Sequence, residues 1–215
     1  MPSPAAETTP REKILEAAEV LFARRGFAGV GLSEIAEAVG LGKSSLFHHF
    51  PTKAQLYAAV LERILHEIET VLVRALAEGG SPVERLDRWV DTIVELLGSE
   101  PSHARLLLRS LFEDDELSGS SDEERAADET LARILQGVSG LLREGMASGA
   151  LRAASIPHTM QTLIGVIIYH FASGELGTEM LGKSLFTPAE VRRRKDEIKA
   201  LLHHGLMAGG GAKGE

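Results

Sequence analysis

Residues Gly31–Lys53 read GLSEIAEAVGLGKSSLFHHFPTK, and this stretch decides the fold. It holds two short helical patterns separated by a turn marked with glycine. The second pattern combines small or polar side chains with an apolar back made by Leu46, Phe47 and Phe50. Two helices joined by a short turn form a helix-turn-helix unit, whose second helix enters the major groove of DNA. The stretch therefore predicts a helix that packs on a small core and also faces DNA.

Composition limits the class of protein. The chain has 215 residues, 44% of them apolar, which is enough for one large or two modest domains with a buried core. It has no cysteine, so disulfide and thiolate chemistry are excluded and a reducing cytoplasm is expected. The start of the chain lacks the apolar segment of a secretory signal, and no apolar run approaches the roughly 20 residues of a membrane helix. We therefore expect a soluble cytoplasmic protein that does not contact a membrane.

Charge is distributed unevenly along the chain. The formal net charge is −8, yet residues 1–55 carry six basic and six acidic side chains, so the whole excess lies beyond residue 55. A neutral N-terminal segment can still bind phosphates through local basic contacts, with a modest dependence on salt. The asymmetry indicates two modules with different tasks.

The spacing of apolar residues predicts an all-α fold, because helical periodicity recurs along the chain and sustained strand alternation does not. Thr9 to Glu12 form a capping box with Pro10 at the first helical position. We expect about nine helices, near 10–25, 32–39, 43–50, 53–77, 82–97, 102–112, 123–147, 156–174 and 188–207. The expected domains are a three-helix DNA-binding head over residues 1–55 and a ligand-binding and dimerisation bundle over residues 56–215.

The head resembles the N-terminal domain of TetR/AcrR-type transcriptional regulators over roughly the first quarter of the chain. The matching residues are Ile14-Leu15, Ala17-Ala18, Leu21-Phe22, Gly26-Phe27, Ile35-Ala36, Gly40-Leu41, Leu46-Phe47-His48-His49-Phe50 and Lys53. The resemblance implies a ligand-responsive DNA-binding regulator, with an operator duplex, a small-molecule effector and a second copy of the chain as partners. It implies neither a cofactor nor a metal. We expect a repressor that its effector releases from the operator, and activation stays open.

Seven side chains are expected at the DNA. They belong to the two helical patterns and the start of the next helix: Ser33, Lys43, Ser44, Ser45, Phe47, His48 and Lys53. Lysine can donate to guanine and serine tolerates several bases, so Lys43 and its neighbours could read base edges. Lys53 is expected to hold a phosphate. The competing interpretation is that these lysines and histidines are ordinary solvated side chains, and for His49 a structural role is expected.

Four of the family's DNA-facing positions are changed in this chain. The family commonly has threonine at the position of Gly31, arginine at Ser33, serine at Gly42 and tyrosine at Phe47. Glycine caps a helix without supplying a hydroxyl, and phenylalanine lacks the phenol that can reach a phosphate. We therefore expect fewer backbone contacts, and weaker or narrower DNA binding, than in a typical member.

The effector half centres on residues 155–174, where apolar side chains surround one expected helix, so burial on all sides is predicted. The resemblance implies that this helix and the one near 188–207 form a four-helix bundle between two subunits. The alternative is the central core helix of a monomer. Candidate pocket residues are Trp89, His103, Leu107, Phe112, Met146, Met160, Ile164 and His170, although for each one taken singly a place in the plain core is the favoured interpretation. Acidic residues 113–116 could steer a cationic effector or form a solvated loop.

Enzyme motifs are weak in this chain. Gly42-Lys43-Ser44 imitates the end of a phosphate-binding loop, but Glu37 stands where that motif needs glycine, and a helix precedes it instead of a strand. The eight histidines lack the spacing of a zinc site. We therefore expect no enzyme. The runner-up is an α-helical small-molecule-binding protein or enzyme without sequence-specific DNA binding.

Overall fold

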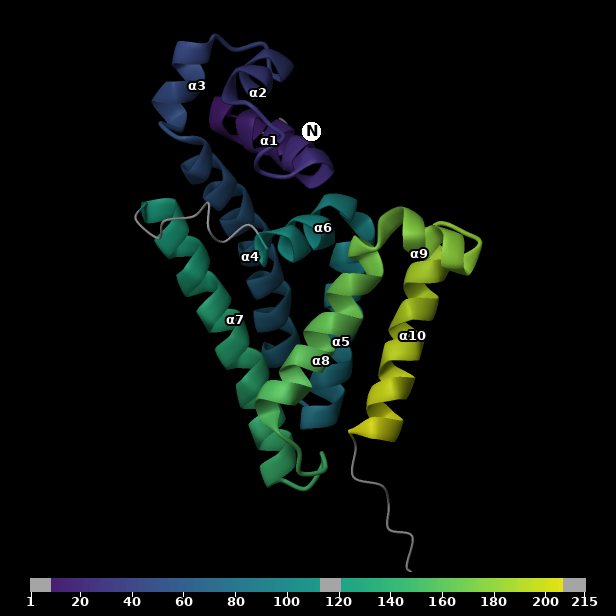
Figure 1. The fold of residues 1–215 in the computed structure, drawn as a ribbon. Helices are drawn as coiled ribbons and strands as arrows, with labels where there is room; N and C mark the ends of the chain where they lie inside the picture. Colours follow the sequence, from purple (N-terminus) through teal and green to yellow (C-terminus); the bar gives the residue numbers. More distant parts are fainter. Residues whose placement is uncertain (1–8, 113–120, 207–215) are drawn as a thin grey trace, which may run out of the picture.

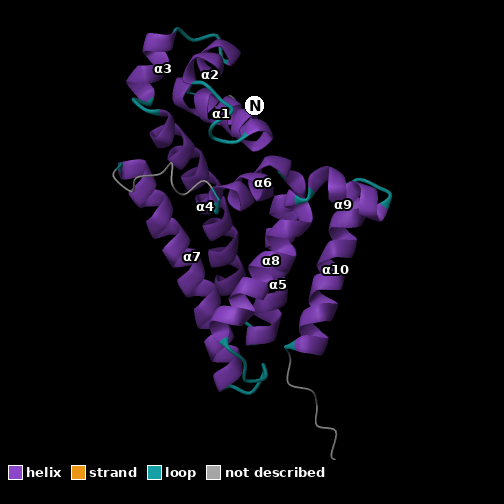
Figure 2. Cartoon of the chain, in the orientation of Figure 1, coloured by secondary structure: helices purple, strands orange, loops and turns teal. Residues whose placement is uncertain are grey.

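The computed structural model describes residues 9–112 and 121–206, which form ten α-helices (Figure 1, Figure 2). They are α1 (Pro10–Arg25), α2 (Leu32–Ala38), α3 (Lys43–His49), α4 (Lys53–Ala77), α5 (Pro82–Ser99), α6 (Pro101–Ser110), α7 (Asp122–Ala147), α8 (Ile156–Ala172), α9 (Gly174–Leu181) and α10 (Pro188–Gly205). The all-α prediction is confirmed. The expected count missed α9, because Gly174 has a φ of +54°, which interrupts the helix that the apolar pattern extended to residue 174.

Local sequence signals explain where several helices begin. Capping boxes start α1, α4, α5 and α7, in which a Ser or Thr side chain accepts from the third helical N–H and the Glu or Gln there accepts in return. Proline occupies the first turn of α1, α5, α6, α8 and α10, where its missing N–H has no helical partner to lose. Gly26 ends α1 with a φ of 72°.

The head consists of α1, α2 and α3, and the start of α4 completes its core. Ile14, Phe22, Ile35, Leu46 and Phe50 are fully buried between these helices. Tyr57 of α4 is also fully buried, and its ring packs edge-on against Phe22 at 5.1 Å and Phe27 at 5.4 Å between centroids. The head therefore depends on α4 for part of its interior.

α4 runs from the head into the body (Figure 1). Its 25 residues span about 37 Å at the helical rise of about 1.5 Å per residue. Within the body it packs along α5 and α7, while α6 packs against both α1 and α8, and α10 packs on α5. The boundary expected at residue 55 falls in the first turn of α4, so one continuous helix belongs to both units.

The predicted burial of α8 on all sides does not hold in this chain. Leu163, Ile167 and Phe171 are buried on one side, whereas Ile164 and Tyr169 are 38% and 55% exposed. In the view of Figure 1, α8 lies in front of α5, between α7 and α10. Among the described helices, none combines the length and apolar character that a membrane crossing requires.

Candidate DNA-binding surface and effector cavity

α3 carries most of the predicted DNA contacts on its outer side. Leu46, and Phe50 just after the helix, are buried and anchor it to the head. Lys43, Ser44 and His48 are exposed, and Phe47 is 37% exposed. The remaining predicted positions on these two helices are Ser45, which is half-buried, and Ser33, which is exposed on α2. The helix thus presents a short set of polar side chains away from its buried back.

Lys53 is engaged within the protein. Its Nζ donates to the backbone carbonyl of Phe27 at 2.9 Å and lies 4.2 Å from the centroid of the Phe27 ring. These contacts tie the first turn of α4 to the segment that follows α1. By comparison, Lys43 is exposed, with its Nζ 5.7 Å from the Phe47 ring centroid. The α3 lysine is therefore better placed to meet a phosphate or a base than the α4 lysine.

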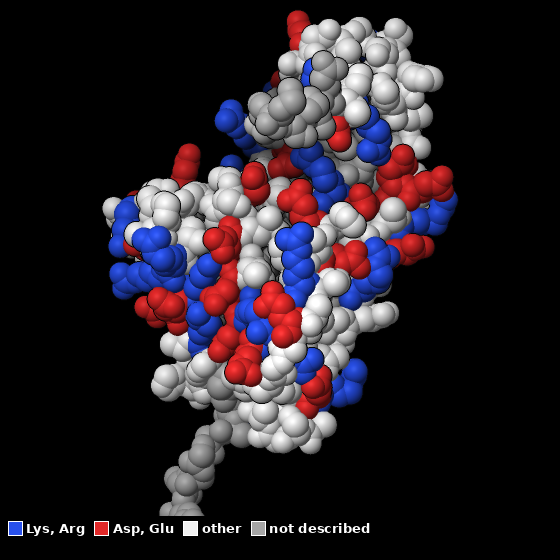
Figure 3. Space-filling model, turned by 180° about the vertical axis from the view of Figure 1, so that it is seen from behind, with Lys and Arg blue, Asp and Glu red and all other residues white. Residues whose placement is uncertain are grey.

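Charge on the face opposite to that of Figure 1 is mixed in sign (Figure 3). Lysine and arginine alternate with aspartate and glutamate over the body, and much of the head on this face is uncharged. Between α5 and α10, Glu95 pairs with Lys195 at 3.0 Å and Asp91 with Lys199 at 2.8 Å, and the Nε2 of His203 lies 2.9 Å from Asp87. On this face, no broad basic surface adds to the few side chains of α3.

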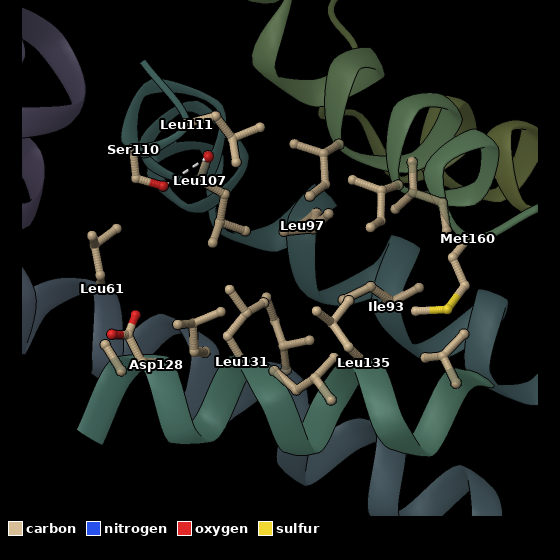
Figure 4. Close-up of a pocket in the computed structure, with 18 of the residues that line it drawn as sticks. Leu61, Ile93, Leu97, Leu107, Ser110, Leu111, Asp128, Leu131, Leu135 and Met160 are labelled. Atoms are coloured by element: carbon tan, nitrogen blue, oxygen red, sulfur yellow. Dashed lines mark hydrogen bonds between the residues drawn. The ribbon is translucent and has the colours of Figure 1, made fainter. Parts of the chain in front are cut away.

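A cavity of about 560 Å³ lies between α4, α5, α6, α7 and α8 (Figure 4). A volume of this size falls within the roughly 300–1,000 Å³ of small-molecule sites. Its wall is overwhelmingly apolar, and the exceptions include Ser110 of α6 and Glu124 and Asp128 of α7. The cavity-lining residues are Ala58, Leu61, Leu65, Ile68, Trp89, Ile93, Leu97, Leu107, Ser110, Leu111, Glu124, Ala127, Asp128, Leu131, Ile134, Leu135, Val138, Met160, Leu163, Ile164, Ile167 and Ile168.

Four of the eight predicted pocket residues line this cavity, namely Trp89, Leu107, Met160 and Ile164. The other four lie elsewhere. Phe112 is 83% exposed at the end of α6, and Met146 packs against the core near the end of α7. His103 and His170 lie at two other helix interfaces, described below. The α7 wall was missed, although its apolar residues 131, 134, 135 and 138 follow helical spacing. The acidic residues 113–116 lie outside the described residues.

His103 belongs to a polar cluster between the head and the body. Glu19 of α1 is 5% exposed, and its carboxylate accepts from Ser102 of α6 and Arg63 of α4. The Nε2 of His103 lies 3.3 Å from Glu19 Oε1. Burial alone would raise the pKa of Glu19, but the hydrogen bonds from His103, Ser102 and Arg63 outweigh it and lower the pKa to about 2. Glu19 is therefore ionised at neutral pH and joins three helices.

His170 lies at the interface of α8 and α10. Burial, and next the positive charge of Arg194, lower its pKa to about 4, against a smaller opposing effect of Glu190. The imidazole is therefore neutral at pH 7. Arg194 donates to the carbonyl of Val166 in α8, and the His170 ring packs edge-on against Phe171 at 4.8 Å. The Nε2 of His170 has no hydrogen-bond partner among the described residues, and His170 is not among the residues that line the cavity.

Comparisons with known proteins agree with this arrangement. The family described as "Bacterial regulatory proteins, tetR family" matches residues 14–60. The HTH-type transcriptional regulator RutR of Escherichia coli (strain K12) is 32% identical over 172 residues, which cover 78% of this chain and 76% of RutR. The chain belongs to the TetR family. TetR-family structures also share its fold: PfmR from Thermus thermophilus is 22% identical with a TM-score of 0.74, covering 94% of this chain and 100% of PfmR.

A second solved structure is AibR in complex with isovaleryl coenzyme A and operator DNA. It is 20% identical with a TM-score of 0.71, and the match covers 89% of this chain and 96% of AibR. As a TetR-family member, the chain is a DNA-binding transcriptional regulator and not an enzyme, which sets aside the runner-up. Within the described residues, no group of three or more His, Asp or Glu side chains is placed to hold a metal ion.

Proposed function

We propose that the chain acts as a homodimeric repressor in the cytoplasm, released from a palindromic operator when a small molecule occupies the cavity. The observation that carries this proposal is the course of α4. This helix completes the head core through Tyr57 and lines the cavity through Leu61, Leu65 and Ile68. Any ligand that favours a shifted α4 would also shift the head.

The proposed reading surface is the outer side of α3. Lys43, Ser44 and His48 would contact base edges or phosphates, with Ser33, Ser45 and Phe47 at its margin and Lys53 behind it. In a two-fold dimer, two such helices would enter successive major grooves about 34–36 Å apart. A change in the tilt of α4 would break this spacing and weaken binding.

A second route supports the coupling between cavity and head. α6 lines the cavity through Leu107 and Ser110 and contacts α1 through Ser102 and His103, which meet Glu19. A ligand can shift this equilibrium only by its differential affinity for the two states, typically about 1–3 kcal/mol. The expected loss of operator affinity is therefore about 5- to 150-fold.

The proposed dimer forms through α8 and α10. Tyr169 of α8 and Leu201 of α10 are each 55% exposed, although both are large apolar side chains. A Cβ built on Gly165 meets nothing within 4 Å, so this part of α8 offers room for a close neighbour. Exposed apolar surface of this kind marks interfaces in soluble proteins.

Operator binding tests the proposal directly. Fluorescence anisotropy with DNA from upstream of the chain's own gene should give saturable, sequence-specific binding. The double variant Lys43→Ala plus His48→Ala should abolish it while circular dichroism stays unchanged. Arg74→Ala, an exposed arginine near the far end of α4, serves as the matched control and should bind like the parent chain. Full binding by the double variant would remove α3 from the reading role, and a reporter assay separates repression from activation.

A further inference from the structure

We propose that the effector is an uncharged, mostly apolar molecule whose carbonyl oxygen accepts a hydrogen bond from Trp89. This inference rests on the proposed function, because it takes the cavity between α4 and α8 as the effector site. Two observations support it: the charged side chains of the lining either have partners already or face solvent, and the buried indole N–H of Trp89 has no acceptor among the described residues.

The lining offers no free charge to a bound ion. None of the described lining residues is lysine, arginine or histidine, so an anion would be buried without a counter-charge. Glu124 already has partners, among them the backbone N–H of Ser121 at 3.1 Å, and Asp128 is exposed to solvent. A cation inside the cavity would therefore meet no unpaired carboxylate. An uncharged molecule avoids both costs.

The cavity has a polar end and an apolar end. Ser110 and Asp128 lie at one end of the close-up, whereas Met160 lies at the other (Figure 4). The hydroxyl of Ser110 already donates to the carbonyl of Leu107 at 3.0 Å. Apart from these polar residues, Glu124 and the indole of Trp89, every described lining residue is aliphatic or methionine. Hydrogen-bond donors for a ligand are therefore scarce along the wall.

Trp89 supplies a donor towards the apolar end. It precedes Ile93 by one turn of α5, and the close-up shows Ile93 beside Met160, with Leu97 closer to Ser110 (Figure 4). Trp89 is 6% exposed and lines the cavity. Its Nε1 is buried and has no hydrogen-bond partner in the part of the chain that the structure describes. A buried donor of this kind is costly unless something satisfies it.

The indole N–H selects the chemistry of the ligand. An indole nitrogen only donates, so its partner must be an acceptor, which an ammonium group cannot be. A carboxylate accepts but brings a charge that the lining does not offset, whereas a carbonyl oxygen accepts without a charge. Because Nε1 is covered in the unliganded chain, we expect a small turn of the indole towards the ligand. The hydrogen bond then stabilises the bound state alone, as a shift of equilibrium requires.

The test uses four probes that share a phenyl ring and a four-carbon chain and differ in their polar group. They are 4-phenyl-2-butanone, butylbenzene, 4-phenylbutanoate and 4-phenylbutylammonium, and calorimetry on the full chain gives their affinities. The ketone should bind at least about tenfold more tightly than either ion, because either ion would be buried without a partner. Equal or tighter binding of the carboxylate or the ammonium overturns the proposal.

The hydrogen bond is tested by Trp89→Phe, which keeps an aromatic ring and removes the N–H. Compared with its effect on butylbenzene, which has no acceptor, the variant should weaken ketone binding by about 2- to 12-fold. Trp89 is the chain's only tryptophan, so one indole N–H resonance reports on it. In the parent chain this resonance should move downfield with the ketone and not with butylbenzene. Equal effects of the variant on both probes, or an unmoved resonance, overturn the proposal.

Two further variants show where the ketone binds. Leu135→Phe fills part of the cavity and should weaken the binding of the ketone and of butylbenzene. Val73→Phe, at a side chain of α4 that is 57% exposed and outside the lining, is the matched control and should bind like the parent chain. Circular dichroism verifies the fold of each variant. Undiminished ketone binding by Leu135→Phe would place the ketone outside the cavity and overturn the proposal.

Operator affinity of the same preparation distinguishes this inference from the proposed function. If the chain binds its operator but prefers either ion to the ketone, the ligand class is wrong and the repressor role stands. If the ketone occupies the cavity through Trp89 yet leaves operator affinity unchanged, the ligand class stands and the proposed release mechanism fails.

Discussion

Inward-facing side chains fill the head, whereas five helices of the body leave a cavity of about 560 Å³. In the head, Phe22, Leu46 and Phe50 are fully buried, and Tyr57 closes the core from α4. In the body, the walls of the cavity are equally apolar but lack neighbours on one side. Close packing makes a unit that moves as a whole, while a void gives a ligand something to fill. One unit can therefore respond to the other only through α4, which both share, and through the contact of α6 with α1.

The largest expected effect separates the two kinds of apolar site. Phe22→Ala removes a ring that is fully buried in the head, so we expect the free energy of unfolding to fall by about 3–5 kcal/mol. Leu135→Ala truncates a side chain that already faces the cavity, so we expect the free energy of unfolding to fall by only about 1 kcal/mol. Denaturant unfolding of the two variants measures both values, and comparable losses would contradict the contrast between the units.

The next effect concerns the link between the units. Glu19→Gln removes the negative charge that Arg63 and His103 contact. We expect the free energy of unfolding to fall by about 2–3 kcal/mol, a value reduced because the partial exposure of Arg63 weakens its ion pair. Because the folded pKa of Glu19 is lowered from 4.5 to about 2, its contribution is complete above pH 4.5. It is lost as the pH falls through about 2.

Urea unfolding across this pH range measures the difference between the parent chain and Glu19→Gln. Glu16→Gln, an exposed position on the same helix, is the matched control and should change little at any pH. A difference that persists unchanged at pH 2 would show that the Glu19 charge is not the stabilising element. If the cluster also transmits the effector signal, Glu19→Gln should reduce the effect of a ligand on operator affinity.

The proposed dimer gives a third test. Gly165→Gln places a side chain on the exposed face of α8, and we expect the dimer dissociation constant to rise about 30-fold, which is about 2 kcal/mol. Gly140→Gln on α7 is a matched control, because a Cβ there also meets nothing within 4 Å. Sedimentation velocity at micromolar concentrations gives the comparison. If both variants remain dimeric, α8 does not form the interface at this position.

His170 supplies a smaller effect of pH. Its pKa is about 4 in the folded chain against about 6.5 in an unfolded one, so the unfolded chain binds more protons between these values. Stability should therefore fall as the pH drops from 6.5 towards 4. We expect a loss of about 1–2 kcal/mol, which is smaller than the full difference in pKa implies because the ring is only half-buried. In His170→Gln this part of the pH dependence should disappear. Thermal unfolding of the parent chain and of His170→Gln at pH 7 and pH 4.5 measures the loss of stability over this range. An equal loss in the two chains would contradict the assignment of this pH dependence to His170.

The reliability of the sequence predictions differed between the two units for a physical reason. The elements of the head follow from local signals: a capping box at Thr9, glycines at 26 and 40, and apolar residues at helical spacing. Which α-helical faces meet at the cavity depends on how five helices pack, and no local pattern encodes that arrangement. His103 and His170 were therefore candidates for the pocket wall, although neither lines the cavity. The short α9 depended on the backbone of Gly174, which its neighbours determine.

The smallest expected effect sharpens the account of the reading surface. Phe47→Tyr adds a hydroxyl to a ring that is 37% exposed on α3, at a position where the resemblance implies a tyrosine that contacts phosphate. One added hydrogen bond contributes about 0.5–1.5 kcal/mol, so operator affinity should improve about 2- to 12-fold. Anisotropy titrations of the parent chain and the variant measure the ratio.

The salt dependence tells whether the gain comes from that contact. A phenol is neutral, so the slope of log affinity against log salt should not change, and for the parent chain it should be shallower than about −6. Phe112→Tyr, on a ring 83% exposed at the end of α6, is the control and should leave operator affinity unchanged. An equal gain from both substitutions would remove the phosphate contact from the explanation. A parent slope steeper than about −6 would mean that more phosphates are held than the few polar side chains around α3 can reach.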